Sequence, residues 1–129
     1  MQFERFLVFS FDCAWAGSLA LCESGGLLIA LAEMAIASDI GARLLAAPAA
    51  IVPHAYWFGE DQARYIVTVS ESDAGLVLAK MRGAGVPCAR IGTTGGAEVA
   101  VAGEAAVSIA ALKNGFESWF PAYMNGKVT

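Results

Sequence analysis

The 129-residue chain has little charge and few side chains that perform chemistry. Charged residues make up 16% of it, hydrophobic residues make up 57%, and His54 is the single histidine. A Ser-His-Asp or Cys-His mechanism would therefore have only one possible base. The eight Lys and Arg residues are scattered and the net charge is −4, so no basic stripe exists for a phosphate backbone. We expect no nucleic-acid partner, and we expect another domain or subunit to cover part of this surface.

Cysteines and long apolar runs are also scarce. Cys13, Cys22 and Cys88 are odd in number and form no CxxC pair, which argues against a disulfide framework or a zinc site. Glu33 interrupts the most apolar stretch, so no run reaches the roughly 18 residues of a membrane span. Asp12 interrupts the apolar part of the N-terminus, which does not fit a signal peptide. We expect a cytoplasmic protein with no membrane partner and no metal site.

The sequence contains no GxGxxG, P-loop, GxSxG or HExxH motif, but its hydrophobic periodicity is informative. It predicts one domain with strands over 5–13, 41–47, 63–70 and 86–92, and one or two short strands around Gly103. Helices are predicted from about 27 to 39, over 73–85 and over 108–120, the last ended by Pro121. Pro48 and Pro53 bracket a predicted loop, and residues 93–96, TTGG, predict a hairpin turn. Interleaved elements with short turns predict an α+β fold, with helices packed on a mixed sheet.

Ser24, Gly25 and Gly26 precede the first predicted helix. Small residues at a helix N-terminus let a phosphate or another anion approach free backbone N–H groups. The same residues also serve as ordinary capping, and the neighbouring Glu23 would repel a phosphate. Both interpretations remain open, with capping favoured.

Glu60, Asp61 and Gln62 stand directly before the strand predicted over 63–70. Two carboxylates and an amide there are suited to orient a ligand's hydroxyl groups or to help hold a hard cation. They are poorly placed as an acid/base pair, because adjacent residues of a strand project to opposite sides. Arg64 is a possible partner for either carboxylate. The local pattern favours a structural turn, with His54 as a packed loop residue.

Four stretches occur in the order and spacing of one known family: GGLLIALAEMAIASDIGARL, PHAYWFGEDQARYIVTV, AGVPCARIGTTGG and NGFESWFPAYM. Over about residues 24–124 the chain resembles the last domain of phosphoribosylformylglycinamidine synthase, the purine-biosynthesis ligase that uses ATP and glutamine to convert formylglycinamide ribonucleotide to formylglycinamidine ribonucleotide. The resemblance implies a three-layer α/β/α arrangement with partial ferredoxin-like topology, shared with the C-terminal domain of aminoimidazole ribonucleotide synthetase. ATP and Mg²⁺ belong to the parent family, and no cofactor is expected in the isolated chain.

The same resemblance narrows the expected site. Glu60, Asp61 and Gln62 look like the vestigial counterpart of a ribonucleotide contact, while no residue here matches a catalytic one. The family's His-Asp-x-Ser-Asp-Gly-Gly-Leu motif is altered in residues 20–27, where the glycines and the leucine persist but the histidine and both aspartates do not. We therefore expect a divergent segment over 1–23 with a probable strand, followed by the family domain over 24–129. A gene fragment, a frameshifted product and a stand-alone copy all fit this expectation.

Three roles follow from these observations. The first is a non-catalytic domain that packs against neighbouring synthetase domains and is inactive alone. The second is an interaction module that forms a homodimer, for which Trp15, Trp57 and Trp119 are candidate surface residues, although each is equally suited to a core. The third is a sensor of a ribonucleotide or phosphate that uses Ser24, Gly25 and Gly26 together with the acidic stretch at 60–62.

Overall fold

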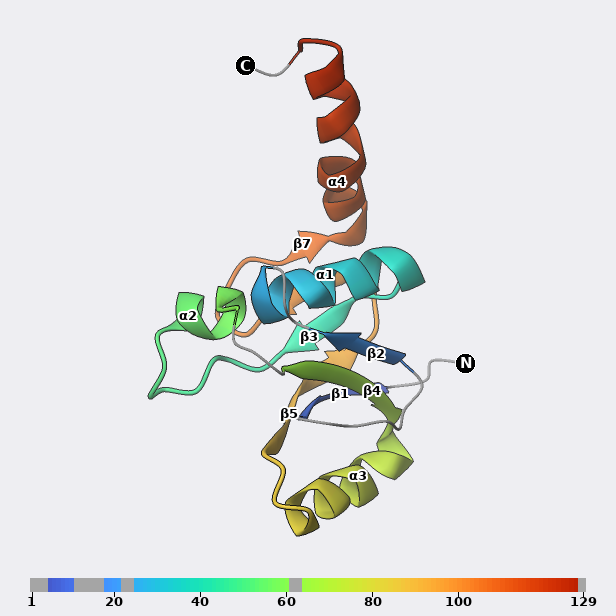
Figure 1. Ribbon diagram of the computed structural model, residues 1–129. Coiled ribbons are helices and arrows are strands. Elements are labelled where there is room, and N and C mark those ends of the chain that lie inside the picture. The colour runs from blue at the N-terminus through green and yellow to red at the C-terminus, as the bar shows by residue number, and fades with distance from the viewer. Residues whose placement is uncertain (1–4, 11–17, 22–24, 61–63, 128–129) are drawn as a thin grey trace.

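The computed structural model describes residues 5–10, 18–21, 25–60 and 64–127. Within them the chain forms a seven-stranded sheet and four helices (Figure 1). The elements, in chain order, are β1 (Arg5–Ser10), β2 (Ser18–Leu21), α1 (Gly26–Ser38), β3 (Ala42–Leu44), α2 (Pro53–Phe58), β4 (Tyr65–Ser70), α3 (Glu71–Gly83), β5 (Cys88–Thr94), β6 (Glu98–Val101), β7 (Val107–Ser108) and α4 (Ile109–Met124).

The sheet is mixed, with the strand order β2-β4-β1-β5-β3-β6-β7. Strand β1 lies inside the sheet and pairs antiparallel with both β4 and β5. Strands β4 and β5 are therefore parallel to each other, and α3 connects them across β1, which is the split β-α-β unit of ferredoxin-like folds. Strands β3 and β6, in contrast, are direct neighbours and pair in parallel. The α+β prediction and its partial ferredoxin-like topology are confirmed, and the segment expected to diverge supplies an interior strand.

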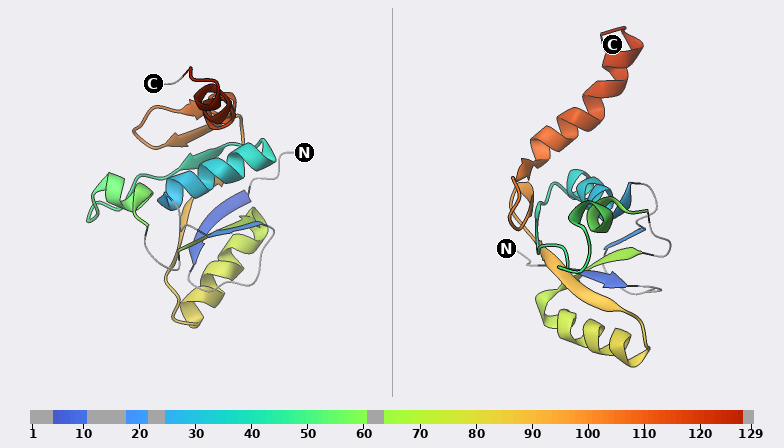
Figure 2. Two further views of the ribbon diagram at one scale, coloured as in Figure 1. Left: turned by 45° about the horizontal axis from the view of Figure 1, so that its top comes forward. Right: turned by 90° about the vertical axis from the view of Figure 1, so that its left-hand side faces the viewer.

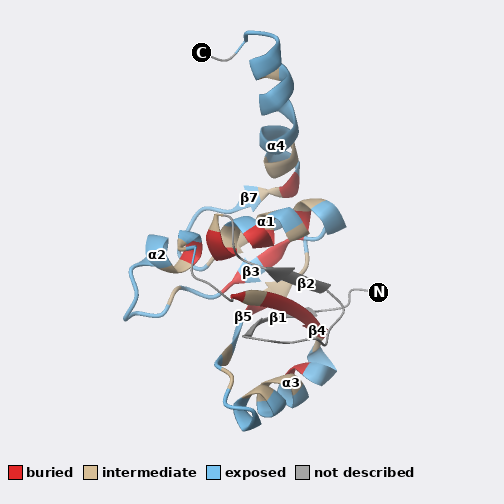
Figure 3. Cartoon of the chain, viewed as in Figure 1, coloured by how far each residue is buried: buried red, intermediate tan, exposed pale blue. Residues whose placement is uncertain are grey.

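Helices cover both faces of the sheet, and strand β4 contributes to the core on each side. Ile66 joins the larger cluster with α1 and Trp57 of α2, whereas Val67 and Val69 join a smaller cluster under α3. This alternation is the period-2 pattern predicted from the sequence. Figure 3 shows that buried residues concentrate on β4 and on the side of α1 that faces the sheet, while most of α4 is exposed. The three-layer α/β/α arrangement follows from these two clusters.

Two short segments differ from the sequence-based expectations. Residues 53–58 form helix α2, with Pro53 in its first turn, where the missing N–H of proline costs nothing; His54 is therefore helical and not in a loop. The TTGG stretch makes no hairpin, because β3 lies between β5 and β6 and Thr93 and Thr94 belong to β5.

The ends of two helices also differ from their prediction. Helix α4 continues through Pro121 to Met124. Ser70 stands at the N-cap of α3 but makes no capping bond to the helix backbone; its hydroxyl donates to a carboxylate oxygen of Asp73 at 2.6 Å. Ser108 caps α4, since its Oγ accepts a hydrogen bond from the N–H of Ala111 at 3.1 Å. No helix in the described part of the chain is long and apolar enough to span a membrane.

Candidate functional site

Helix α1 begins in close contact with the end of α2. Gly25 and Gly26 have φ values of 78° and 81°, in the left-handed region that favours glycine. A Cβ atom on Gly26 would lie 2.6 Å from the carbonyl carbon of Phe58 and 2.9 Å from the carbonyl oxygen of Gly59. Those neighbours are backbone atoms that cannot rotate away. Gly26 therefore lets two chain segments meet at a distance that no larger residue permits.

Glu60 joins the two sequence features singled out above. Its Oε1 accepts a hydrogen bond from the backbone N–H of Gly25 at 2.8 Å. A carboxylate at a helix N-terminus satisfies a donor that has no partner within the helix and interacts favourably with the helix dipole. The predicted anion position at the start of α1 is thus occupied, at Gly25, by an anion of the chain itself. Ser24, Asp61 and Gln62 lie outside the described residues.

Arg64 fixes the other end of this contact. It is 5% exposed, and its guanidinium donates hydrogen bonds to the carbonyl oxygens of Tyr56 at 3.0 Å and Gly59 at 3.4 Å. A cation there offsets the negative end of α2 and satisfies carbonyls at its last turn. Of the two acidic partners predicted for Arg64, Asp61 lies outside the described residues. The hydrogen bonds described here give Arg64 the role of holding the end of α2.

Tyr56 and Trp57 complete this corner. Their rings meet edge to face with centroids 4.8 Å apart, and the guanidinium of Arg64 lies 5.3 Å from the centroid of the Tyr56 ring. Trp57 is buried in the main core. Burial raises the pKa of the Tyr56 phenol above its usual value of 10.0, although the nearby positive charge of Arg64 opposes part of this rise. The phenol therefore stays protonated at neutral pH and is unsuited to act as a base.

An apolar groove of about 690 Å³ opens beside α2. Its walls come from α1, α2, the strand β6 with the turn that follows it, and the first turns of α4. His54 and Glu104 are the titratable residues among those that line it, and the rest of the lining is largely aliphatic and aromatic. The volume falls in the range of small-molecule sites, but the groove lacks the several convergent polar groups such sites use. It brings together no nucleophile, base and orienting group.

The aromatic residues of α4 were not recognised as functional candidates from the sequence as a group. Phe116, Trp119, Phe120 and Tyr123 are all more than half exposed, and Trp119 stacks on Tyr123 with ring centroids 5.2 Å apart. The signal was present, since spacings of three and four residues place side chains on one face of a helix. Among the described residues, no cluster of three or more His, Cys, Asp and Glu side chains is arranged to hold a metal ion.

Residues 24–104 match the family model described as AIR synthase related protein, C-terminal domain. The phosphoribosylformylglycinamidine synthase subunit PurL of Bradyrhizobium sp. strain BTAi1 is 76% identical over 104 residues, which are 81% of this chain and 14% of that protein. PurL of Nitrobacter hamburgensis is 65% identical over 106 residues, again 14% of its length. The chain thus spans about one seventh of the length of these relatives.

Solved structures with the same fold include two enzymes. "T. maritima PurL complexed with ATP" matches with a TM-score of 0.68 at 15% identity, over 87% of this chain and 26% of that one. Thiamine-monophosphate kinase from Stenotrophomonas maltophilia matches with a TM-score of 0.60 at 22% identity, over 71% of this chain and 33% of the kinase. At these identities the likeness concerns the fold.

Proposed function

Because the chain belongs to the family of AIR synthase related proteins, C-terminal domain, and is 76% identical to a segment of PurL, we propose that it is a non-catalytic C-terminal domain, or a fragment, of a phosphoribosylformylglycinamidine synthase. Its role there is structural: it supports neighbouring synthetase domains in an ATP- and glutamine-dependent amidination of formylglycinamide ribonucleotide. The chain is inactive alone. It is located in the cytoplasm and serves de novo purine biosynthesis.

The hydrogen bond from the Gly25 N–H to Glu60 carries this proposal. A site that holds a phosphate presents free N–H groups at a helix N-terminus, whereas here the chain's own carboxylate accepts from one of them. That carboxylate would also repel an incoming phosphate. The most distinctive acidic residue of the sequence is thereby used to join α1 to the end of α2, which is a structural task.

A weaker auxiliary role in holding a nucleotide remains part of the proposal. It assigns Glu60, Asp61 and Gln62 to a vestigial ribonucleotide contact and the start of α1 to a phosphate. ATP and Mg²⁺ would bind to other domains of the parent enzyme. A ligand that binds only the folded chain raises its midpoint of thermal unfolding, increasingly so above its Kd. Phosphate, ADP, ATP and the substrate ribonucleotide are the ligands to test, and no shift with any of them would remove the auxiliary role.

A chimera tests the structural role. The matching 104 residues of the Bradyrhizobium PurL are replaced by those of this chain, and amidination is assayed with the partner subunits that the relative requires. We expect the chimera to retain turnover within about tenfold, and the same chimera with Gly26→Val to lose it together with its soluble yield, because Cβ atoms cannot fit at that position.

The isolated chain is the second arm of this experiment. It should show no amidination with ATP, glutamine and the ribonucleotide. Robust turnover by the chain alone would refute a non-catalytic role, and an inactive but well-folded chimera would refute its equivalence to the PurL segment.

A second candidate function is an interaction module that forms a homodimer. The observation that favours it is the aromatic face of α4, which is exposed over most of the helix length. This candidate function is compatible with an origin in a synthase. It requires, in addition, an exposed surface that can bind a second copy of the chain.

A further inference from the structure

One face of α4 starts in the core and continues into solvent. At 100° per residue, six apolar side chains fall on one side of the helix: Ile109, Leu112, Phe116, Trp119, Phe120 and Tyr123. Ile109 is 3% exposed, whereas Phe116 is 69% and Phe120 is 61% exposed. Figure 1 and the right-hand view of Figure 2 show why, since α4 projects away from the rest of the domain. We call the exposed part of this face, Phe116, Trp119, Phe120 and Tyr123, the aromatic stripe.

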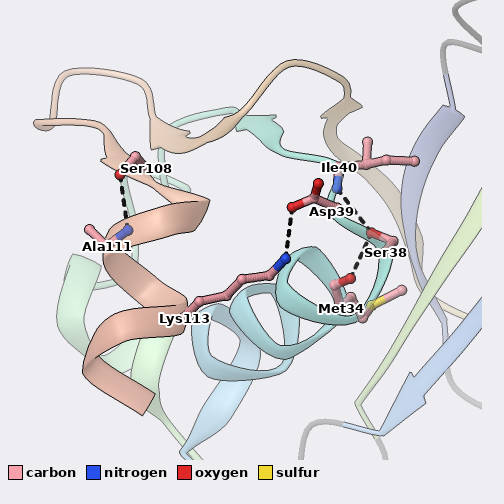
Figure 4. A network of polar contacts seen from close by, with 7 residues as sticks. All are labelled: Met34, Ser38, Asp39, Ile40, Ser108, Ala111 and Lys113. Atoms are coloured by element: carbon pink, nitrogen blue, oxygen red, sulfur yellow. Dashed lines mark hydrogen bonds and ion pairs between the residues drawn. The ribbon is translucent and has the colours of Figure 1, made fainter. Parts of the chain in front are cut away.

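The base of α4 is fixed to the domain. Strand β7 ends at Ser108 and α4 begins at Ile109, so no linker separates them. The hydroxyl of Ser108 caps the helix, and the ammonium group of Lys113 lies 2.8 Å from Oδ1 of Asp39 at the end of α1 (Figure 4). The buried side chain of Ile109 adds a core contact. Without breaking these contacts, the helix cannot swing to lay its stripe on its own groove.

The groove and the aromatic stripe form one continuous surface. Leu112 lines the groove and stands on the same face of α4 as the stripe, one turn before Phe116. The projecting helix and the body of the domain thus make a corner with an apolar hollow at its base. Lys113 and Glu117 fall beside the stripe and do not interrupt it, so covering the stripe requires no charge to be buried.

The size of this corner fits a partner of the same kind. Each of the four aromatic side chains is more than half exposed, so together they present roughly 400–600 Å². Two copies would cover about 1,000 Å² through the stripes alone, and more through the grooves, which reaches the range of specific interfaces. Each copy carries both a projecting stripe and a receiving groove, so a two-fold symmetric contact can place the stripe of each copy in the groove of the other.

We propose that the corner binds a second copy of this chain. In the dimer the two α4 helices exchange, so that the aromatic stripe of each copy packs into the groove of the other. This deepens the second candidate function and is independent of whether the synthase chimera is active.

Sedimentation velocity over a concentration series tests the proposal with the full chain. We expect a monomer–dimer equilibrium. The double variant Phe116→Gln/Phe120→Gln should raise the dissociation constant at least about 30-fold, as loss of interface hot spots does, and glutamine is a good helix former. Ala105→Glu, which places a charge on an exposed residue of the groove, should weaken the dimer similarly. Leu76→Gln on α3, 56% exposed and away from the corner, is the matched control and should leave the constant unchanged.

Mixing the stripe variant, Phe116→Gln/Phe120→Gln, with the groove variant, Ala105→Glu, distinguishes exchange of the α4 helices from simple pairing of one helix with the other. A stripe variant and a groove variant together keep one intact stripe–groove contact, so the mixture should form more dimer than either variant alone. Circular dichroism of dilute samples checks that each variant is folded. A wild-type chain that stays monomeric at about 100 μM, or a dimer that survives both variants, would overturn the proposal. A monomer that binds a PurL lacking its matching segment would assign the corner to the synthase instead.

Discussion

The corner around Glu60 and the helix α4 carry two of the stretches by which the chain resembles its family, yet they use their residues in opposite ways. Around Glu60 the polar contacts are made within the chain: Arg64 is almost completely buried, and the exposed side chain of Glu60 bonds to the start of α1. On α4 the aromatic side chains point outward, and beyond Ile109 none of the helix is buried. The first stretch is explained by the folding of this chain alone.

The second stretch is not. Four aromatic side chains facing water are costly to keep in an isolated domain, and contiguous apolar patches on monomers mark interaction sites. The difference shows that residues typical of one family are explained by different physical causes. Some make contacts within the chain, and others face outward to contact another molecule. The difference also makes separate predictions for mutations in the two regions.

Gly26→Ala should have the largest effect on stability. The new Cβ would be forced against the backbone of Phe58 and Gly59 at a positive φ, so the free energy of unfolding should fall by about 3 kcal/mol or more. Gly75→Ala is the matched control, since Gly75 lies within α3 with nothing near its missing Cβ, and it should gain about 0.5–1 kcal/mol. Urea denaturation measures both. Equal, small effects would contradict the close contact between α1 and α2.

Arg64→Met should come next. Methionine keeps much of the apolar stem but removes the donors to the carbonyl oxygens of Tyr56 and Gly59, which should cost about 2–3 kcal/mol. Arg43→Met, at an exposed position of β3, should change stability by less than about 0.5 kcal/mol. If the two variants unfold at the same urea concentration, Arg64 does not hold the end of α2.

A smaller effect is expected from Tyr56 at high pH. Because its pKa is raised in the folded state, the unfolded chain loses the phenol proton first as the pH rises. Stability that is fully present below pH of about 10 should then decline above it, until the folded phenol ionises too. Tyr56→Phe should remove this part of the alkaline decline in the thermal midpoint. Tyr123→Phe on α4 is the control. If both substitutions changed the decline of the thermal midpoint with pH equally, burial of Tyr56 would not be its cause.

The smallest effect on stability should come from the aromatic stripe. In dilute, monomeric protein, Phe116→Gln/Phe120→Gln should shift the free energy of unfolding by no more than about 0.5 kcal/mol, because both side chains are exposed. Chemical denaturation at low micromolar concentration tests this. A loss above about 1.5 kcal/mol would mean that α4 packs on its own domain, and the contrast between the two regions would be lost.

Local periodicity predicted α1, β4 and the α+β class because their burial patterns repeat along the chain. Helix α2 was missed since six residues are too few for a helical period to show, and Pro53 was interpreted as a loop boundary. The prediction of a hairpin at residues 93–96 is wrong because β3 inserts between β5 and β6. Such an insertion is decided by tertiary structure and leaves no local sequence pattern.

The candidate site was predictable only in part. Glu60 and Gly25 were both singled out, but their hydrogen bond spans 35 residues and follows no local pattern. The continuation of α4 past Pro121 was equally hidden, since a proline usually ends a helix. Asp61 and Gln62 keep their predicted role in a ribonucleotide contact as a proposal.

Hydrogen–deuterium exchange of dilute and concentrated protein compares the two regions in one measurement. We expect the contacts around Glu60 to lie within one chain and the corner at α4 to bind a second copy. Backbone amides over 99–107 and 112–124 should then exchange more slowly at high protein concentration. Amides over 59–60 and 64–66, which do not line the groove, should exchange alike at both concentrations. Two results would contradict this division between contacts within the chain and contacts with a second copy. One is protection of the α4 amides that does not depend on protein concentration, and the other is an equal change in protection around Glu60.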